Sequence, residues 1–205
     1  MKKILAVLLS VIAISLSAQD ARYEIKSAII KTKTVGTGTE RIIYIDDYGK
    51  KESLEMTQVI GGIENRIRII YEDIYSTTVN LDSKQGSKIL ALRLVNFLHL
   101  TPEVIEKYKL KEAGEEEFLG KVCKIYYEER TTIGGLTMRA KSWVWKGIVL
   151  KSESSYDGGT SSTIATEIKE NVVIPSEKFT VPKDVNISDK TPPISSNRAP
   201  IIINR

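Results

Sequence analysis

The chain has 205 residues, of which 41% are hydrophobic, 27% charged and 7% aromatic. These proportions are typical of one globular domain and exclude a disordered chain, a collagen-like repeat and a protein with several membrane-spanning helices. The formal net charge is +4 at pH 7 and falls to +2 without residues 1–18, which contain Lys2 and Lys3 but no acid. Near neutrality argues against a nucleic-acid-binding protein, because such proteins gather Lys and Arg on one face.

The N-terminus has the pattern of a secretory signal peptide. Two lysines precede an apolar run from Ile4 to Leu16, and Ser17-Ala18 come before polar residues. Retention as a membrane anchor is the alternative, but a spanning helix needs roughly 20 apolar residues and this run is shorter. No cysteine follows the run to receive a lipid. We therefore expect cleavage near Ala18 and a protein of the periplasm with no membrane anchor.

Strands are predicted in chain order between glycine-rich turns that recur every ten to thirteen residues or so. Segments rich in Ile, Val, Tyr and Thr lie at 23–33, 41–47, 51–59, 63–71, 74–81, 112–118, 121–131, 136–146, 148–156 and 161–170. Many short strands with hairpin-length connections indicate an antiparallel meander. The predicted fold class is mainly β (α+β), with one large curled antiparallel sheet or unclosed β-barrel.

Two helices are expected between these two blocks of strands. Residues 87–100 are rich in Leu and Ala, which are good helix formers, and are apolar on most sides. Thr101-Pro102-Glu103 then supplies an N-cap, a first-turn proline and an early acid for a second helix over 102–109. Helices of this kind need apolar partners, so we expect both to lie across the concave side of the sheet as a lid.

An apolar ligand site is expected between sheet and lid. The strands at 42–45 and 67–71 carry large apolar side chains in both alternating sets, whereas a sheet wetted on one side shows cleaner alternation. Trp143 and Trp145 project from one face, either as core or as ligand-lining residues. The expected wall residues are Ile43, Ile45, Ile67, Ile69, Tyr71, Trp143 and Trp145, and the expected lid residues are Leu90, Leu94, Phe97, Leu98, Ile105 and Tyr108. A wrong parity in one strand turns its whole set to the other face.

Catalytic equipment is not recognisable in the sequence. The single cysteine, Cys123, lies in a strand-like stretch and is expected to be buried, with a reactive thiol as the alternative, while His99 lies in an apolar run that suggests packing. One cysteine and one histidine build neither a disulfide nor a zinc site, and the acids at 46–47 and 115–117 are interpreted as turn or solvated charges. We expect no enzyme, no metal and no cofactor.

Several segments resemble the LolA/LolB-like superfamily of periplasmic lipoprotein carriers, and more closely the uncharacterised secreted proteins with that fold. They are YEIKS at 23–27, DDYGK at 46–50, LDSKQG at 81–86, GKVCK at 120–124 and WVWKGIVLK at 143–151. The resemblance covers about residues 22–182 and implies a curled sheet, plugging helices and an apolar interior that accepts acyl chains. The carriers open with an N-terminal helix, whereas this chain is expected to enter its first strand by Tyr23.

The sequence therefore predicts a signal peptide at 1–18, a LolA-like domain at 19–182 and an extended proline-containing tail at 183–205. The expected function is that of a soluble, monomeric periplasmic carrier or binding protein for an apolar ligand such as a lipid or a lipoprotein acyl chain. The alternative is an envelope protein-interaction or sensor module that uses the same fold without lipid. The closing isoleucines 201–203 either belong to a disordered end or add a strand to a sheet edge.

Overall fold

A computed structural model describes residues 21–72, 74–90, 95–131, 135–156 and 159–191, so the expected signal peptide lies outside the described residues. The described elements are β1 (Ala28–Val35), β2 (Glu40–Asp46), η1 (Asp47–Gly49), β3 (Lys51–Ile60), β4 (Ile63–Glu72), β5 (Tyr75–Asn80), β6 (Gln85–Leu90), α2 (Pro102–Tyr108), β7 (Lys111–Phe118), β8 (Lys121–Thr131), β9 (Thr137–Trp145), β10 (Ile148–Tyr156), β11 (Gly159–Glu170), η2 (Ser176–Phe179) and β12 (Asn186–Asp189). The predicted strands coincide with β1–β5 and β7–β11 within a few residues.

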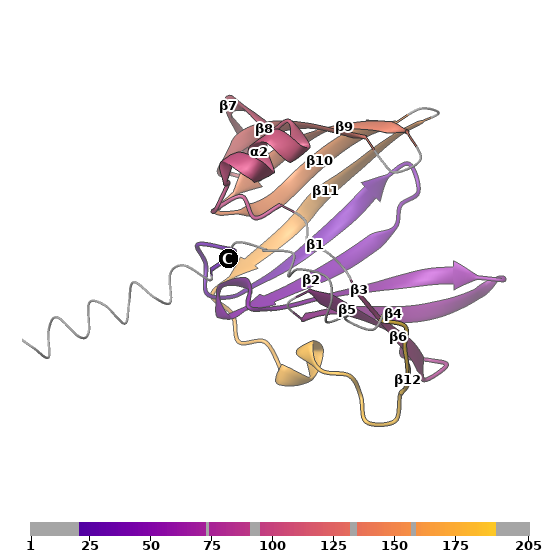
Figure 1. The fold of residues 1–205 in the computed structure, drawn as a ribbon. Coiled ribbons are helices and arrows are strands. Elements are labelled where there is room, and N and C mark those ends of the chain that lie inside the picture. Colours follow the sequence, from indigo (N-terminus) through magenta and orange to yellow (C-terminus); the bar gives the residue numbers. More distant parts are fainter. Residues whose placement is uncertain (1–20, 73, 91–94, 132–134, 157–158, 192–205) are drawn as a thin grey trace, which may run out of the picture.

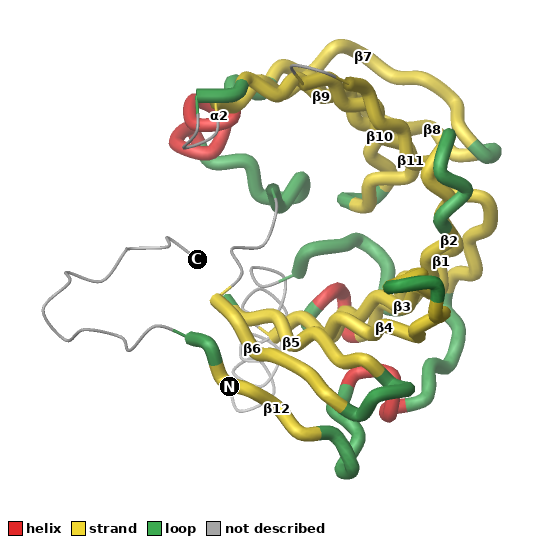
Figure 2. The backbone as a smooth tube through the Cα atoms, turned by 90° about the vertical axis from the view of Figure 1, so that its right-hand side faces the viewer, coloured by secondary structure: helices red, strands yellow, loops and turns green. Residues whose placement is uncertain are grey.

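All twelve described strands belong to one sheet in the order β12-β6-β5-β4-β3-β2-β1-β11-β10-β9-β8-β7. Each neighbouring pair is antiparallel except β12 and β6, which are parallel. Two meanders, β1–β6 and β7–β11, are thus joined by the pairing of β1 with β11. The sheet curls into an open C, with β7 and β12 as its edges (Figures 1 and 2). The expected unclosed, curled sheet is confirmed.

Residues 23–27 are an irregular segment rather than the start of the first strand, which begins at Ala28. This segment crosses one end of the sheet, where the Glu24 amide donates to the Lys146 carbonyl at 3.1 Å. Tyr23 packs so closely on Gly49 that a Cβ there would lie 2.5 Å from its ring. Gly49 also has φ +88°, so both the backbone and the close approach require glycine.

The prediction of a helix over 87–100 is wrong at 87–90 and 95–100, the part of this segment that the structure describes. Residues up to Leu90 form β6, which pairs with β5 on one side and β12 on the other, and 95–100 form an irregular segment with a turn. Helix propensity is a weak preference, and ladder hydrogen bonds on both sides of β6 outweigh it. The second helix is confirmed as α2, whose Thr101 hydroxyl accepts from the Val104 amide at 3.3 Å.

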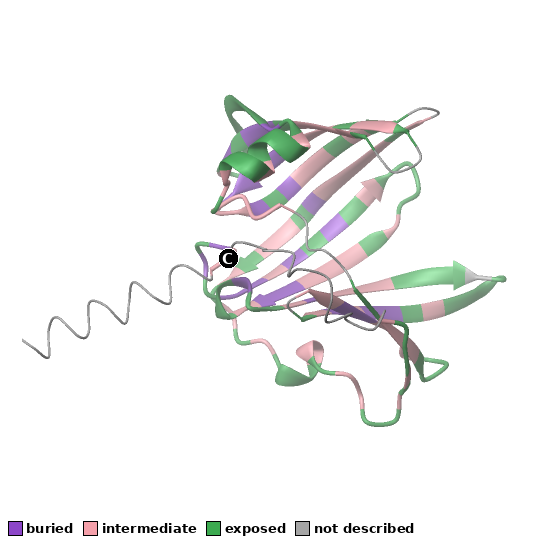
Figure 3. Ribbon diagram, in the orientation of Figure 1, coloured by how far each residue is buried: buried purple, intermediate pink, exposed green. Residues whose placement is uncertain are grey.

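The apolar core gathers on the middle strands, while the tip of the long β3–β4 hairpin is exposed (Figure 3). The core comprises Tyr23, Ile25, Ala28, Ile30, Ile45, Cys123, Ile125, Trp143, Trp145, Ile148, Leu150 and Ala165. These residues come from both meanders and from the segment before β1. The core therefore holds together the two halves that the β1–β11 pairing joins.

The chain after β11 returns along the outer face of β2–β4 (Figure 1). Arg68 of β4 donates from Nη1 to the Glu177 carbonyl at 2.7 Å, and Lys178 Nζ lies 3.0 Å from the Glu55 carboxylate of β3. The chain then pairs β12 with β6, where the Asn186 amide donates to the Lys84 carbonyl at 3.0 Å. The segment expected as a tail from residue 183 thus begins with a docked strand. The isoleucines 201–203 lie outside the described residues.

Candidate functional site

The concave side of the sheet encloses a cavity of about 730 Å³. In the first meander, cross-strand pairing places Ile43 of β2 and Ile69 of β4 on the concave face. In the second meander, it places Tyr126 of β8, Ser142 of β9 and Ser152 of β10 together on that face. The cavity lining draws on both meanders, so the curl of the sheet brings together residues that are far apart in sequence (Figure 2).

The predicted wall residues from the first meander all lie on this face. Ile43, Ile69 and Tyr71 line the cavity. Ile45 and Ile67 share the face by register, but they are buried outside the cavity lining. The structure therefore brings three of these five residues to the candidate site.

The two tryptophans lie outside the cavity. Trp143 alternates with Ser142, which lines the cavity, and so points to the outer face, as does Trp145 two positions later. The Trp143 indole Nε1 donates to the Glu116 carboxylate of β7 at 2.7 Å. The Lys141 and Lys151 ammonium groups stand 4.2 and 4.0 Å from the Trp143 ring centroid. Trp143 is thus enclosed by charged side chains of the outer face.

The predicted lid is formed in part. Phe97 and Tyr108 line the cavity, and the Phe97 ring lies 5.0 Å from that of Tyr126. Leu98 packs against Gly147, where a Cβ would lie 3.0 Å from Leu98 Cγ and φ is +83°. Leu90 and Ile105 are exposed, and Leu94 lies outside the described residues. The segment 95–108, rather than two packed helices, faces the cavity.

Polar side chains on the concave face were not anticipated. Glu128 and Arg130 of β8 follow Tyr126 at alternate positions and line the cavity. Within the described ranges Glu128 forms no hydrogen bond or ion pair, and Arg130 contacts Met138 Sδ at 3.5 Å. Burial raises the pKa of the Glu128 carboxyl, and the Arg130 charge opposes that rise. Their alternation with Tyr126 was the available signal, because alternate strand residues share a face.

A second carboxylate, that of Glu52, lines the end of the cavity opposite Glu128, and it has a hydrogen-bond partner. Glu52 accepts a hydrogen bond from the Tyr23 hydroxyl at 3.1 Å. Burial, with the charge of Glu52, raises the pKa of the Tyr23 hydroxyl above its ordinary value, and Arg22 opposes the rise. Tyr23 therefore stays protonated and continues to donate to Glu52 at neutral pH.

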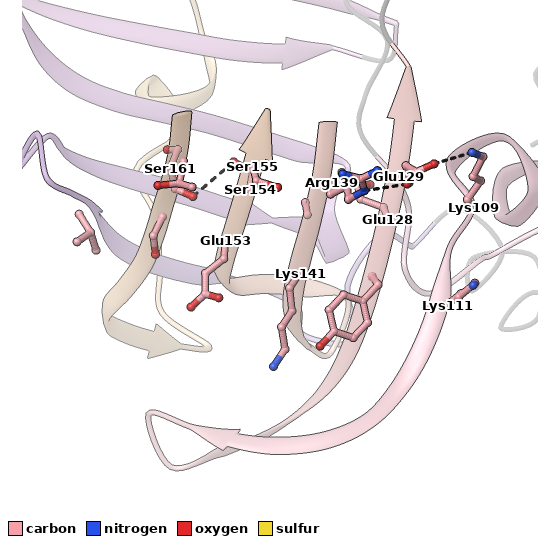
Figure 4. A pocket seen from close by; sticks show the side chains of 15 residues that line it. Lys109, Lys111, Glu128, Glu129, Arg139, Lys141, Glu153, Ser154, Ser155 and Ser161 are labelled. Atoms are coloured by element: carbon pink, nitrogen blue, oxygen red, sulfur yellow. Dashed lines mark hydrogen bonds and ion pairs between the residues drawn. The ribbon is translucent and has the colours of Figure 1, made fainter. Parts of the chain in front are cut away.

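A second hollow of about 920 Å³ lies on the outer face of β8–β11, and Glu128 borders it as well as the concave cavity (Figure 4). Its charged side chains are largely paired: Glu129 accepts from Lys109 Nζ at 2.6 Å and Arg139 Nε at 2.9 Å. Lys141 donates to Glu116 at 2.8 Å, and Glu153 lies 2.8 Å from Lys151. These pairs resemble a solvated surface, so we place the candidate site in the concave cavity although the outer hollow is larger.

Reactive groups are sparse in the described part of the chain. No set of three or more His, Cys, Asp or Glu side chains there is placed to hold a metal ion. Cys123 is buried, as expected, and burial raises the pKa of its thiol, while His99 is exposed in a turn rather than packed. Among the described helices, none has the length and apolar character needed to cross a bilayer.

Fold and cavity define the class of protein: a single curled sheet around a concave trough, the architecture implied by the LolA/LolB-like resemblance. The structure is similar to that of an uncharacterised conserved protein from Thermus thermophilus, with a TM-score of 0.54 at 10% identity over 87% of this chain and 99% of that one. This similarity shows a shared fold. No family model matches the sequence, and no curated protein matches it.

Two further solved structures match with lower TM-scores. The Pseudomonas aeruginosa MucA/MucB complex gives a TM-score of 0.47 at 12% identity, with 82% of this chain covering 60% of that one. The Mycobacterium tuberculosis lipoprotein LppX gives 0.42 at 13% identity, with 83% of this chain covering 99% of that one. The chain thus spans less than two thirds of the matched MucA/MucB chain.

Proposed function

We propose that this protein binds or carries an apolar ligand, a lipid or a lipoprotein acyl chain, in the concave trough. The observation that carries the proposal is the cavity of about 730 Å³, a size typical of small-molecule sites. Ile43, Ile69 and Tyr71 form one wall, and Phe97 and Tyr108 face them from the segment 95–108. We further propose that the protein acts in the periplasm as a monomer and catalyses no reaction.

The energetics favour a hydrocarbon ligand. Each buried CH₂ group contributes roughly 0.8 kcal/mol, so ten methylenes contribute about 8 kcal/mol before the cost of association. This gain needs no charged partner in the apolar part of the trough. Release would follow movement of the segment 95–108 or competition from an acceptor.

The second candidate is a protein-interaction module without lipid cargo. Hydroxyl groups of Ser76, Thr78 and Ser152 line the cavity beside the apolar side chains. Hydroxyls can hydrogen-bond a peptide backbone, so the same trough offers a peptide both polar and apolar contacts. A co-purifying ligand distinguishes the two candidates.

The test is native mass spectrometry of residues 19–205 purified from the periplasm without detergent, followed by titration with a dansyl-labelled fatty acid. Ile43→Asp puts a charge in the trough wall and is expected to weaken fatty-acid binding at least tenfold. Ile42→Asp is the matched control, because Ile42 is the adjacent, equally half-buried residue on the opposite face. An unliganded mass together with no fatty-acid binding would overturn the proposal, as would equal losses in the two variants.

A further inference from the structure

We propose that Glu128 and Arg130 form a headgroup site in the trough, which makes the ligand a single-chain zwitterionic phospholipid with an ammonium and a phosphate group. The inference rests on the proposed function and narrows its ligand class. It assigns a role to Glu128 and Arg130, which act on each other electrostatically but form no ion pair with another residue in the described structure.

The pair lies at the opposite end of the trough from Ile69 and Tyr71, where the cavity-lining carboxylate of Glu52 already accepts from the Tyr23 hydroxyl. Glu128 and Arg130 lie near the end of β8, which stops at Thr131. Because the strands from β8 through β1 to β4 alternate in direction, this end of β8 lies at the same end of the sheet as the start of β4. Ile69 and Tyr71 lie towards the opposite end of β4. An amphiphile can therefore place its headgroup at one end and its chain along the wall.

The spacing of the two charges suits a zwitterion. Side chains two positions apart on a strand share a face and are separated by roughly 6.5–7 Å along the strand. The Glu128 carboxylate can accept from an ammonium group while the Arg130 guanidinium donates to a phosphate, for which its planar fork is well shaped. Ser154 stands on the same face, two strands away through Ala140; its hydroxyl donates to the Ser161 carbonyl at 3.4 Å, and its oxygen can accept from the ammonium group.

Glu128 differs from Glu129 and Glu52 in lacking a hydrogen-bond donor among the described residues. Glu129, its neighbour on the opposite face, accepts from both Lys109 and Arg139, and Glu52 accepts from Tyr23. Glu128 is half-buried without such a donor. A partly buried carboxylate without a donor is unfavourable, and a bound ammonium group would supply one. The charge of that ammonium group would also offset the effect of burial on the Glu128 pKa.

The test compares ligands of one chain length on the mature chain by isothermal titration calorimetry: lysophosphatidylethanolamine, lysophosphatidylglycerol and the free fatty acid. The ethanolamine lipid is expected to bind at least tenfold more tightly than the glycerol lipid. Glu128→Gln should remove that preference without weakening the glycerol lipid, and Arg130→Gln should weaken both phospholipids. Glu129→Gln and Arg139→Gln are the matched controls and should change neither affinity. Glycerophosphoethanolamine, the headgroup without a chain, should not bind measurably.

Outcomes separate this inference from the proposed function. If the wild-type protein binds all three lipids equally, the headgroup site is overturned and the apolar carrier stands. The same holds if Glu129→Gln abolishes the preference as fully as Glu128→Gln. If none of the three lipids binds, the carrier function fails as well. Tight binding of glycerophosphoethanolamine would overturn the proposal that the ligand is an amphiphile, because that compound has no chain. The wild-type comparison needs no variant, so a folding defect in Glu128→Gln leaves the test decisive.

Discussion

Removing the charge of Glu55 is expected to destabilise the outer face of the sheet and the chain segment docked on it. The Glu55 carboxylate accepts from Arg68 Nε at 2.9 Å, from Lys178 Nζ at 3.0 Å and from the Tyr44 hydroxyl at 3.1 Å. The side chain of Arg68 is only 9% exposed, so it depends on Glu55 for a counter-charge. Glu55→Gln leaves that guanidinium buried beside a neutral amide.

The expected loss follows from this burial. Breaking a buried ion pair by removing one partner costs about 3–5 kcal/mol, and we expect about 3 kcal/mol because Glu55 is partly exposed and Gln keeps one acceptor oxygen. Against a total stability of roughly 5–15 kcal/mol this is a large change. Urea unfolding should show it as a midpoint lowered by about 1–2 M with an unchanged slope.

Two further variants test the reasoning. Glu167→Gln removes an exposed carboxylate that bridges Lys31 at 2.6 Å and Lys169 at 3.1 Å, and should hardly shift the urea midpoint, because exposed ion pairs contribute little. Replacing both Glu55 and Arg68 by Met should restore much of the stability, because the buried guanidinium is removed with its partner and only the partly exposed Lys178 loses its carboxylate. A Glu55→Gln loss no greater than that of Glu167→Gln would refute the reasoning, as would a double variant no more stable than the single one.

Three other expectations concern acid, the docked strand and the thiol. Burial opposes ionisation of Glu55, but hydrogen bonds from Lys178 and Arg68 outweigh this effect and hold the Glu55 pKa below its ordinary value. The contribution of Glu55 to folding stability is therefore present above about pH 4.5 and is lost as pH falls through the lower folded pKa. Wild type and Glu55→Gln should converge in acid unfolding curves. Truncation after Pro182 removes β12 and should cost about 1–3 kcal/mol through lost ladder hydrogen bonds, and an unchanged Tm would contradict docking. Cys123 is 0% exposed and burial raises its pKa, so thiol reagents should label it only upon unfolding, whereas fast labelling of the native protein would contradict burial.

The strands were predictable because turn chemistry and residue type agree along most of the chain. The turn at Gly61-Gly62 joins β3 and β4, and the turn at Gly120 precedes β8. The sequence predicts a helix that includes Ser87 to Leu90, because the composition of the longer segment 87–100 favours one. Its state is decided by pairing with β5, the preceding strand, and with β12, a partner far along the chain. Local preference carries no information about such partners.

The candidate site was predictable on one meander and less so on the other. Ile43, Ile69 and Tyr71 line the cavity as expected from their alternation. Trp143 does not, because both faces of β9 are buried at its end and alternation there gives no sign of which face is concave. Glu128 was missed because charged residues in strands usually face water.

The β1–β11 pairing has a consequence for how the chain acquires its structure. Each meander consists of hairpins that close locally, but Ala28 must find Glu170 across nearly the whole sheet-forming sequence. Pairings so distant in sequence form slowly, because the entropy of closing the intervening loop is lost first. Until they form, β1 and β11 are open edges able to pair with other chains. A newly made chain is therefore most exposed to aggregation before β1 and β11 have paired at the centre of the sheet.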